Sequence, residues 1–170
     1  VIPRLSADKR PLYQSILDKA QWQKILELWH TPYHQTLTDL LRLACAHNER
    51  AFLIDLHSMP DNPDRPSRTK FCPPASRRLP DFVFGNLHGA TLTHKVVGRI
   101  ERVMSQTGFS WHWNTPYAGG YITRHYGLTK KENGLSPSIE VLQIEVNRRL
   151  YKSKMKNQHN ARIITVKKVI

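Results

Sequence analysis

The sequence is poor in cysteine and contains no long apolar run. Its 170 residues include two cysteines, Cys45 and Cys72, too few for a disulfide framework or a Cys-rich zinc site. No stretch approaches the roughly 20 apolar residues that span a bilayer, and no signal-peptide pattern is present. These absences predict a cytoplasmic protein in a reducing setting, with no membrane partner.

Acidic residues are half as numerous as basic ones. The chain has 13 Asp and Glu against 26 Lys and Arg, for a formal net charge of +13, and 39% of its residues are hydrophobic. The hydrophobic content predicts one globular domain over 1–151, followed by a basic tail over 152–170. The excess of basic residues has two interpretations. The basic clusters either neutralise a polyanionic partner, or they lie in a solvated loop and tail. Because the aromatic residues show no stacking-platform pattern, we rank a nucleic-acid binder last.

Short apolar runs alternate with helical patterns, and no internal repeat is visible. The first helix is predicted to end at Thr31-Pro32, with Thr31 as the N-cap of the second. The alternation predicts an α/β fold in which a mixed, mostly parallel sheet is flanked by helices. The expected helices are 15–28, 33–47 and 91–106, and the expected strands are 51–56, 82–84, 110–113 and 141–146.

His57 is the first candidate for chemistry. It follows the apolar run 51–56, and a His at the carboxyl end of a buried strand is a common metal ligand or catalytic imidazole. Asp55 shares a face with His57 in an extended strand and can fix the imidazole tautomer. The alternative is a structural histidine that bonds to Asp55 or to a backbone carbonyl. The other histidines lack the ligand spacing H-E-x-x-H.

Glu145 is the second candidate, because it stands in an otherwise apolar strand. Gln143, Glu145 and Asn147 point to one face of that strand, and carboxylates are rarely buried without a partner. The functional interpretation is a general base that deprotonates a metal-bound water. The alternative is an ordinary exposed strand face.

Asn114 and Arg148 are candidates for substrate binding. Asn114 opens the segment 114–120, whose paired glycines allow close backbone approach, and an Asn side chain can donate to a developing oxyanion. Arg148 and Arg149 can bind a carboxylate through the planar guanidinium, or they can be solvated charges.

Five motifs, taken in their order along the chain, resemble those of a known protein family. They are Pro32-Tyr33-His34, Asp55-Leu56-His57-Ser58-Met59-Pro60, Pro80-Asp81-Phe82-Val83-Phe84-Gly85 with His88-Gly89, Asn114-Thr115-Pro116-Tyr117-Ala118-Gly119-Gly120-Tyr121-Ile122-Thr123, and Leu142-Gln143-Ile144-Glu145-Val146-Asn147-Arg148-Arg149-Leu150-Tyr151. Together they resemble the N-formylglutamate amidohydrolase family.

The resemblance implies a zinc-exopeptidase-like α/β fold and hydrolysis of N-formylglutamate to glutamate and formate, late in histidine degradation. It implies that His57 is a zinc ligand and Glu145 the catalytic base or acid, with Asp55 supporting His57. Small acidic N-acyl amino acids become the expected substrates, and their carboxylates are expected to bind to Asn114, Arg124 and Arg148.

The chain also departs from the family pattern. The family takes a His and an acidic zinc ligand from an upstream segment, and Asn86 and Leu87 stand where an acidic residue and an Arg are usual. We therefore expect a fold that is incomplete at the N-terminus, with the other zinc ligands upstream of Val1. The 170-residue chain is expected to bind zinc weakly or not at all. The alternative function is a truncated, non-catalytic family remnant that binds an acidic ligand or partner. The oligomeric state is not specified by the sequence.

Overall fold

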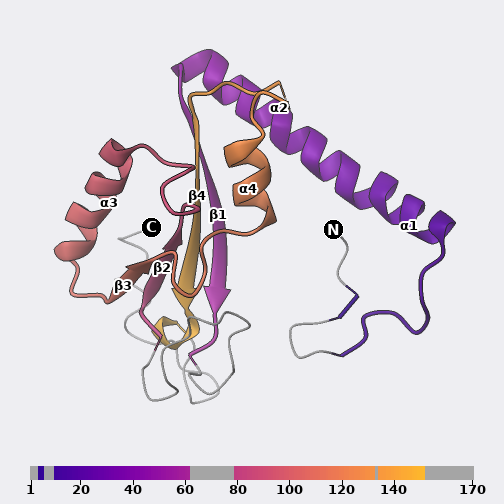
Figure 1. Cartoon of the computed structure of the whole chain (residues 1–170), viewed down its shortest axis with the longest axis horizontal. Helices are drawn as coiled ribbons and strands as arrows, with labels where there is room; N and C mark the ends of the chain where they lie inside the picture. Colours follow the sequence, from indigo (N-terminus) through magenta and orange to yellow (C-terminus); the bar gives the residue numbers. More distant parts are fainter. Residues whose placement is uncertain (1–3, 6–9, 62–78, 133, 152–170) are drawn as a thin grey trace. The chain divides into compact units, whose positions relative to one another are not determined.

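The computed structural model describes residues 4–5, 10–61, 79–132 and 134–151 (Figure 1). The chain forms two compact units, Val1–Leu40 and Leu41–Ile170. The predicted basic tail, 152–170, lies outside the described residues, and so does Cys72.

A capping box starts the helical part of the first unit. Asp18 Oδ1 accepts a hydrogen bond from the Gln21 backbone N at 2.8 Å, and Gln21 Oε1 accepts one from the Asp18 backbone N at 3.0 Å. Two otherwise unpaired backbone donors are thereby satisfied at the start of α1 (Lys19–Ile25). The predicted start at residue 15 was therefore four residues too early.

The predicted break at Thr31-Pro32 is wrong. α1 continues through a π-helical turn, η1 (Leu26–His30), into α2 (Thr31–Asn48). Thr31 has helical backbone angles, and its N–H donates to the Leu26 carbonyl five residues earlier. A π turn inserts one extra residue into the helix, and the chain stays helical up to Pro32. Pro32 has no backbone N–H to donate to the helix.

The second unit is built on a four-stranded sheet with the order β1-β4-β2-β3. Its strands are β1 (Ala51–Met59), β2 (Phe82–Gly85), β3 (Trp111–Trp113) and β4 (Ile139–Asn147). β1 pairs with β4 and β2 with β3 in parallel, whereas β2 and β4 are antiparallel. The predicted mixed, mostly parallel sheet is confirmed.

Helices cover both faces of this sheet. α3 (His94–Ser105) lies on one face and α4 (Tyr121–Leu128) on the other (Figure 1). A single turn of 3-10 helix, η2 (Arg148–Leu150), follows β4. Every residue of β4 is buried, as expected for a central strand between two helical layers.

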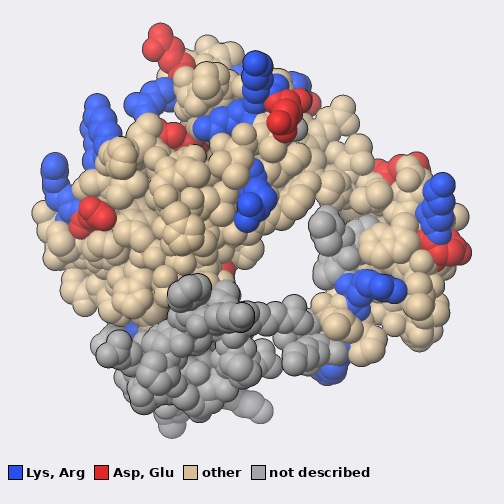
Figure 2. Space-filling model, viewed as in Figure 1, with Lys and Arg blue, Asp and Glu red and all other residues tan. Residues whose placement is uncertain are grey.

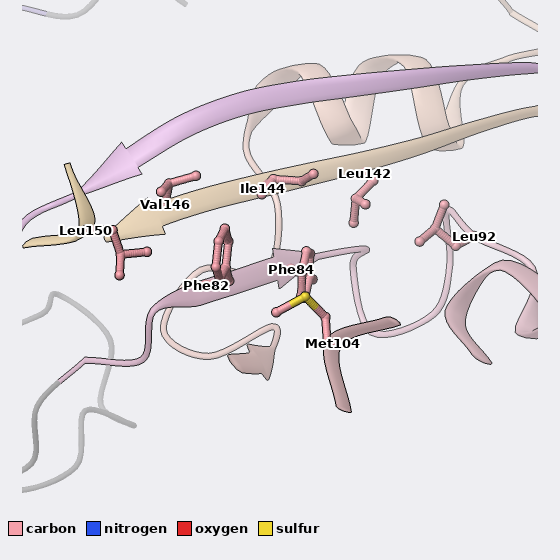
Figure 3. Close-up of a cluster of buried hydrophobic side chains, with 8 residues drawn as sticks. All are labelled: Phe82, Phe84, Leu92, Met104, Leu142, Ile144, Val146 and Leu150. Carbon is pink, nitrogen blue, oxygen red and sulfur yellow. The ribbon is translucent and has the colours of Figure 1, made fainter. Parts of the chain in front are cut away.

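The core lies between α3 and the sheet (Figure 3). Leu142, Ile144 and Val146 alternate along β4 and point to the α3 face, where Met104 of α3 packs against them. The intervening residues of β4, including Gln143 and Glu145, therefore face α4. The buried cluster consists of Phe82, Phe84, Leu92, Met104, Leu142, Ile144, Val146 and Leu150.

Candidate functional site

His57 and Asp55 project from the same face of β1, as predicted. His57 Nε2 lies 2.9 Å from Asp55 Oδ1, and the side chains are 48% and 17% exposed. If Nε2 carries the proton that Asp55 accepts, Nδ1 holds the ring's lone pair. The prediction that β1 ends before His57 is wrong. The strand continues to Met59 because its parallel pairing with β4 extends to Met59 opposite Asn147.

Glu145 is buried, with 7% of its surface exposed, so the exposed-face alternative is wrong. Burial raises the pKa of the Glu145 carboxyl, and the nearby Asp55 charge acts in the same direction. His57, the hydrogen bond from Gln143 and the charge of Arg148 oppose this shift without cancelling it. Glu145 therefore takes up a proton more readily than an ordinary glutamate.

The strand register brings the two candidates together. His57 stands opposite Glu145, and Asp55 stands opposite Gln143, in the parallel β1–β4 ladder. Neighbouring strands lie about 4.8 Å apart, and residues paired in this way project from the same face of the sheet. The imidazole and the carboxyl therefore share one surface, on the α4 side.

Gln143 connects Glu145 to the turn over residues 118–120, here called the glycine turn, which precedes α4. The sequence analysis did not predict this role. Gln143 Nε2 donates to Glu145 Oε1 at 3.0 Å, while its Oε1 accepts from the Gly120 backbone N at 2.6 Å. The signal in the sequence is the two-residue spacing of polar side chains in an apolar strand. The amide fixes both the carboxyl and the turn.

Gly85 allows the glycine turn to lie directly on β2. A Cβ at this position would be 2.7 Å from the Gly119 backbone N and 2.8 Å from the Ala118 carbonyl carbon. Only a residue without a side chain permits this approach. The predicted close backbone approach of the paired glycines is thereby explained.

Asn114 is engaged with a neighbouring turn. Its Oδ1 accepts hydrogen bonds from the backbone N of Asn86 at 3.0 Å and of His88 at 3.2 Å. Its Nδ2 donates to Asn86 Oδ1 at 2.9 Å. Both ends of the amide therefore hold the 86–89 turn in place, which favours a supporting role over direct contact with a substrate.

The two arginines after β4 have different surroundings. Arg148 Nε donates to Ser58 Oγ at 3.2 Å, next to His57, and its charge influences Glu145. Arg149 instead donates to Asp81 Oδ1 at 2.8 Å and to the Leu79 carbonyl at 2.8 Å. Arg148 thus belongs to the candidate site, and Arg149 ties η2 to the chain before β2.

The candidate site therefore groups His57, Asp55, Glu145 and Arg148. Arg124 is exposed on α4, the helix on the same side of the sheet. A model of the N-formylglutamate amidohydrolase family matches residues 1–152. The chain belongs to this family.

Similar proteins support the family assignment. The chain is 31% identical over 143 residues to N-formylglutamate deformylase of Pseudomonas aeruginosa, a match covering 82% of this chain and 48% of the relative. It is 31% identical over 126 residues to N-formylglutamate deformylase of Pseudomonas putida, covering 74% and 42%. The crystal structure of N-formylglutamate amidohydrolase from Ralstonia eutropha JMP134 matches with a TM-score of 0.74 and 29% identity, covering 94% of this chain and 53% of that one.

The chain thus spans about half the length of the family members that it matches. No three His, Cys, Asp or Glu side chains gather as a metal site within the described residues. A catalytic zinc needs about three protein ligands. The described side chains therefore do not form a zinc site by themselves, although His57 can supply one ligand.

Basic side chains do not merge into one patch on the face shown in Figure 2. Lys and Arg side chains stand there in separate groups, and several of these groups adjoin Asp or Glu side chains. A continuous basic stripe is the usual footprint of a nucleic-acid binder, and this face of the described chain does not display one. Among the described helices, none is long and apolar enough to cross a membrane.

Proposed function

We propose that this chain supplies the part of an active site that contains Glu145. The complete active site is proposed to hydrolyse N-formylglutamate to formate and glutamate. The observation that carries the proposal is the placement of His57 opposite Glu145 on one face of the sheet. The substrate is suggested by the names of the Pseudomonas relatives, both N-formylglutamate deformylases. Because the chain matches half of each relative, the activity is proposed for the complete family domain.

Glu145 is proposed to move the proton that amide hydrolysis requires. Water adds to the formyl carbon, the C–N bond breaks, and the amine nitrogen gains a proton. A carboxyl with a raised pKa is suited to take the proton from water and return it to the nitrogen. The Gln143 amide keeps Oε1 of Glu145 in one orientation, so the proton exchange is assigned to the other oxygen, Oε2.

His57 is proposed to act at the same centre through Nδ1. Asp55 accepts from Nε2 and so orients the ring. Zinc is proposed as the cofactor of the complete domain, with His57 as one ligand and the remaining ligands outside the described residues. Zinc binding is tested separately from the role of Glu145.

Arg148 is proposed to bind a substrate carboxylate. Its guanidinium lies beside Ser58 at the end of β1, and a planar guanidinium can bind a carboxylate with two hydrogen bonds. Arg124 is proposed as a second carboxylate partner, and Asn114 as a support for the nearby turn.

A second candidate is a family remnant that binds an acidic ligand without hydrolysing it. The absence of a three-ligand metal cluster among the described residues favours it. The Arg148 guanidinium beside the site fits an anionic ligand in either case. The two candidates differ in whether a product is released.

A chimera tests the proposal. The matched segment of the Pseudomonas aeruginosa deformylase is replaced by that of this chain, and formate release from N-formylglutamate is measured with zinc present. We expect activity, and a loss of at least about 100-fold in both His57→Gln and Glu145→Gln. His112→Gln and Glu132→Gln change an exposed His and an exposed Glu, and they should keep activity within about twofold. A folded chimera that binds N-formylglutamate and releases no formate would favour the binding remnant.

A further inference from the structure

Two histidines stand four residues apart at the junction between η1 and α2. His30 is the last residue of the π-helical turn η1, and His34 lies in the first turn of α2. Four residues is also the spacing of the two metal ligands in H-E-x-x-H. The glutamate of that motif is absent, because Thr31 follows the first histidine. The pair therefore has the ligand spacing of the motif without its catalytic residue.

The structure brings the two imidazoles together. The ring centroids of His30 and His34 lie 4.3 Å apart, with the ring planes inclined by 47°. Two imidazoles that bind one ion through bonds of about 2.1 Å, at a ligand angle of about 90°, have centroids about 4.5 Å apart. The observed separation is thus already close to that of a chelating pair. Both residues are half-buried, so an ion can reach them from the solvent.

The backbone beside the pair is unusual. The Thr31 N–H donates to the Leu26 carbonyl five residues earlier, and Pro32 comes next, without an N–H to donate. The ordinary hydrogen-bond ladder of the helix is therefore interrupted directly after His30. Single π-helical turns inside α-helices occur frequently at functional sites. The turn is a second observation, independent of the ring geometry, that favours a role for this segment.

Tyr33 supports one of the two rings. Its ring meets that of His34 edge-on, with centroids 5.1 Å apart and an interplanar angle of 90°. This contact restricts the motion of the His34 side chain, and a ring that is already ordered loses less conformational freedom when it binds an ion. The described part of the chain brings no third His, Cys, Asp or Glu to the pair. Water is therefore expected to fill the remaining coordination positions of a bound ion.

We propose that His30 and His34 together bind one divalent transition-metal ion through two imidazole nitrogens. Imidazole suits Zn²⁺, Cu²⁺ and Ni²⁺, and Cu²⁺ binds most tightly of the three at a given site. Two protein ligands hold an ion less tightly than the three or four of a complete zinc site, so the pair agrees with the weak zinc binding expected of this chain. The pair belongs to the first unit and His57 to the second. The proposal does not depend on the roles proposed for His57 and Glu145.

Calorimetric titration of the full 170-residue chain with CuCl₂ and with NiCl₂ tests the site. The chain carries no histidine tag, and the pH is about 7.5 because the ligands must be neutral imidazoles. We expect one ion at the pair, with Cu²⁺ bound more tightly than Ni²⁺. His30→Gln and His34→Gln should each lower the affinity at least about tenfold, since a single ligand loses the advantage of simultaneous binding. His47→Gln changes an exposed histidine further along α2, and it should keep the affinity within about twofold.

Electron paramagnetic resonance of the Cu²⁺ complex gives a second measurement. The wild-type spectrum should show hyperfine splitting from two nitrogen ligands, and the spectrum of either single variant should show splitting from one. Circular dichroism of the variants without metal should match that of the wild type. A loss of binding then reports the loss of a ligand, because the helix is retained.

Three outcomes would overturn the proposal. The first is an affinity for Cu²⁺ and Ni²⁺ that His30→Gln and His34→Gln leave unchanged. The second is a wild-type Cu²⁺ spectrum with splitting from one nitrogen, which indicates adventitious binding to single histidines. The third is a site that His57→Gln abolishes and His30→Gln does not affect, because the ion would then occupy the candidate active site. None of these outcomes depends on whether the complete family domain hydrolyses N-formylglutamate.

Discussion

Replacing Gly85 with alanine should disturb the glycine turn that Gln143 links to Glu145. The new Cβ would lie 2.7 Å from the Gly119 backbone N and 2.8 Å from the Ala118 carbonyl carbon. The turn cannot move away without loss, because the Leu87 N–H donates to the Ala118 carbonyl at 2.7 Å and the Gly120 N–H to Gln143 at 2.6 Å. The added methyl group thus meets the Ala118–Gly119 peptide unit, which these two hydrogen bonds hold in place.

The expected change in the free energy of unfolding follows from two opposing effects. Overpacking a site that cannot relax costs about 1–3 kcal/mol, and the reduced freedom of the unfolded chain returns about 0.5–1 kcal/mol. Gly85→Ala should therefore lower the free energy of unfolding by about 1 kcal/mol. Gly98→Ala is the matched control, since a Cβ there meets nothing within 4 Å in the middle of α3. It should raise the free energy by about 0.5–1 kcal/mol.

Urea unfolding followed by circular dichroism measures both variants. With a slope of about 2 kcal/mol per molar urea, the midpoint should fall by about 0.5 M for Gly85→Ala and rise slightly for Gly98→Ala. If Gly85→Ala unfolds at the wild-type midpoint or above, the turn does not press on β2 as described.

Three further predictions concern neighbouring groups. Arg149→Met should lower the free energy of unfolding by about 2 kcal/mol, because it leaves Asp81 buried without its guanidinium partner; a loss below about 0.5 kcal/mol in urea unfolding would contradict this. Glu145→Gln should gain stability over the wild type as the pH rises. The folded carboxyl has a raised pKa, so its contribution is full below the unfolded pKa of about 4.5 and is lost as the pH rises through the folded pKa. A variant-minus-wild-type difference that stays constant from about pH 4 to pH 8 would refute that linkage. Zinc titration of the 170-residue chain by calorimetry should show weak binding or none, and nanomolar binding with one ion per chain would contradict this.

The polar face of β4 could be predicted from the sequence. Strict alternation in a strand puts Gln143 and Glu145 on one side whatever the strand's neighbours are. The same argument placed Asp55 beside His57, and the 2.9 Å separation confirms it. These predictions succeed because they depend on local geometry alone.

The register between β1 and β4 could not be predicted in this way. His57 and Glu145 are paired although they lie 88 positions apart in the sequence, and no local pattern specifies which residues of two distant strands face each other. The extension of β1 to Met59 has the same origin, because it follows from pairing with Asn147. The contacts of Asn114 were missed since they depend on the backbone of a turn 26–28 residues away.

A double-mutant cycle on the chimera tests most directly whether His57 and Glu145 act at one centre. Formate release is measured for His57→Gln, Glu145→Gln and the double variant. When two groups serve one reacting centre, the effects of removing them are strongly non-additive. The rate of formate release of the double variant should therefore be within about threefold of that of the less active single variant. Losses that multiply, as for two independent sites, would contradict the shared centre.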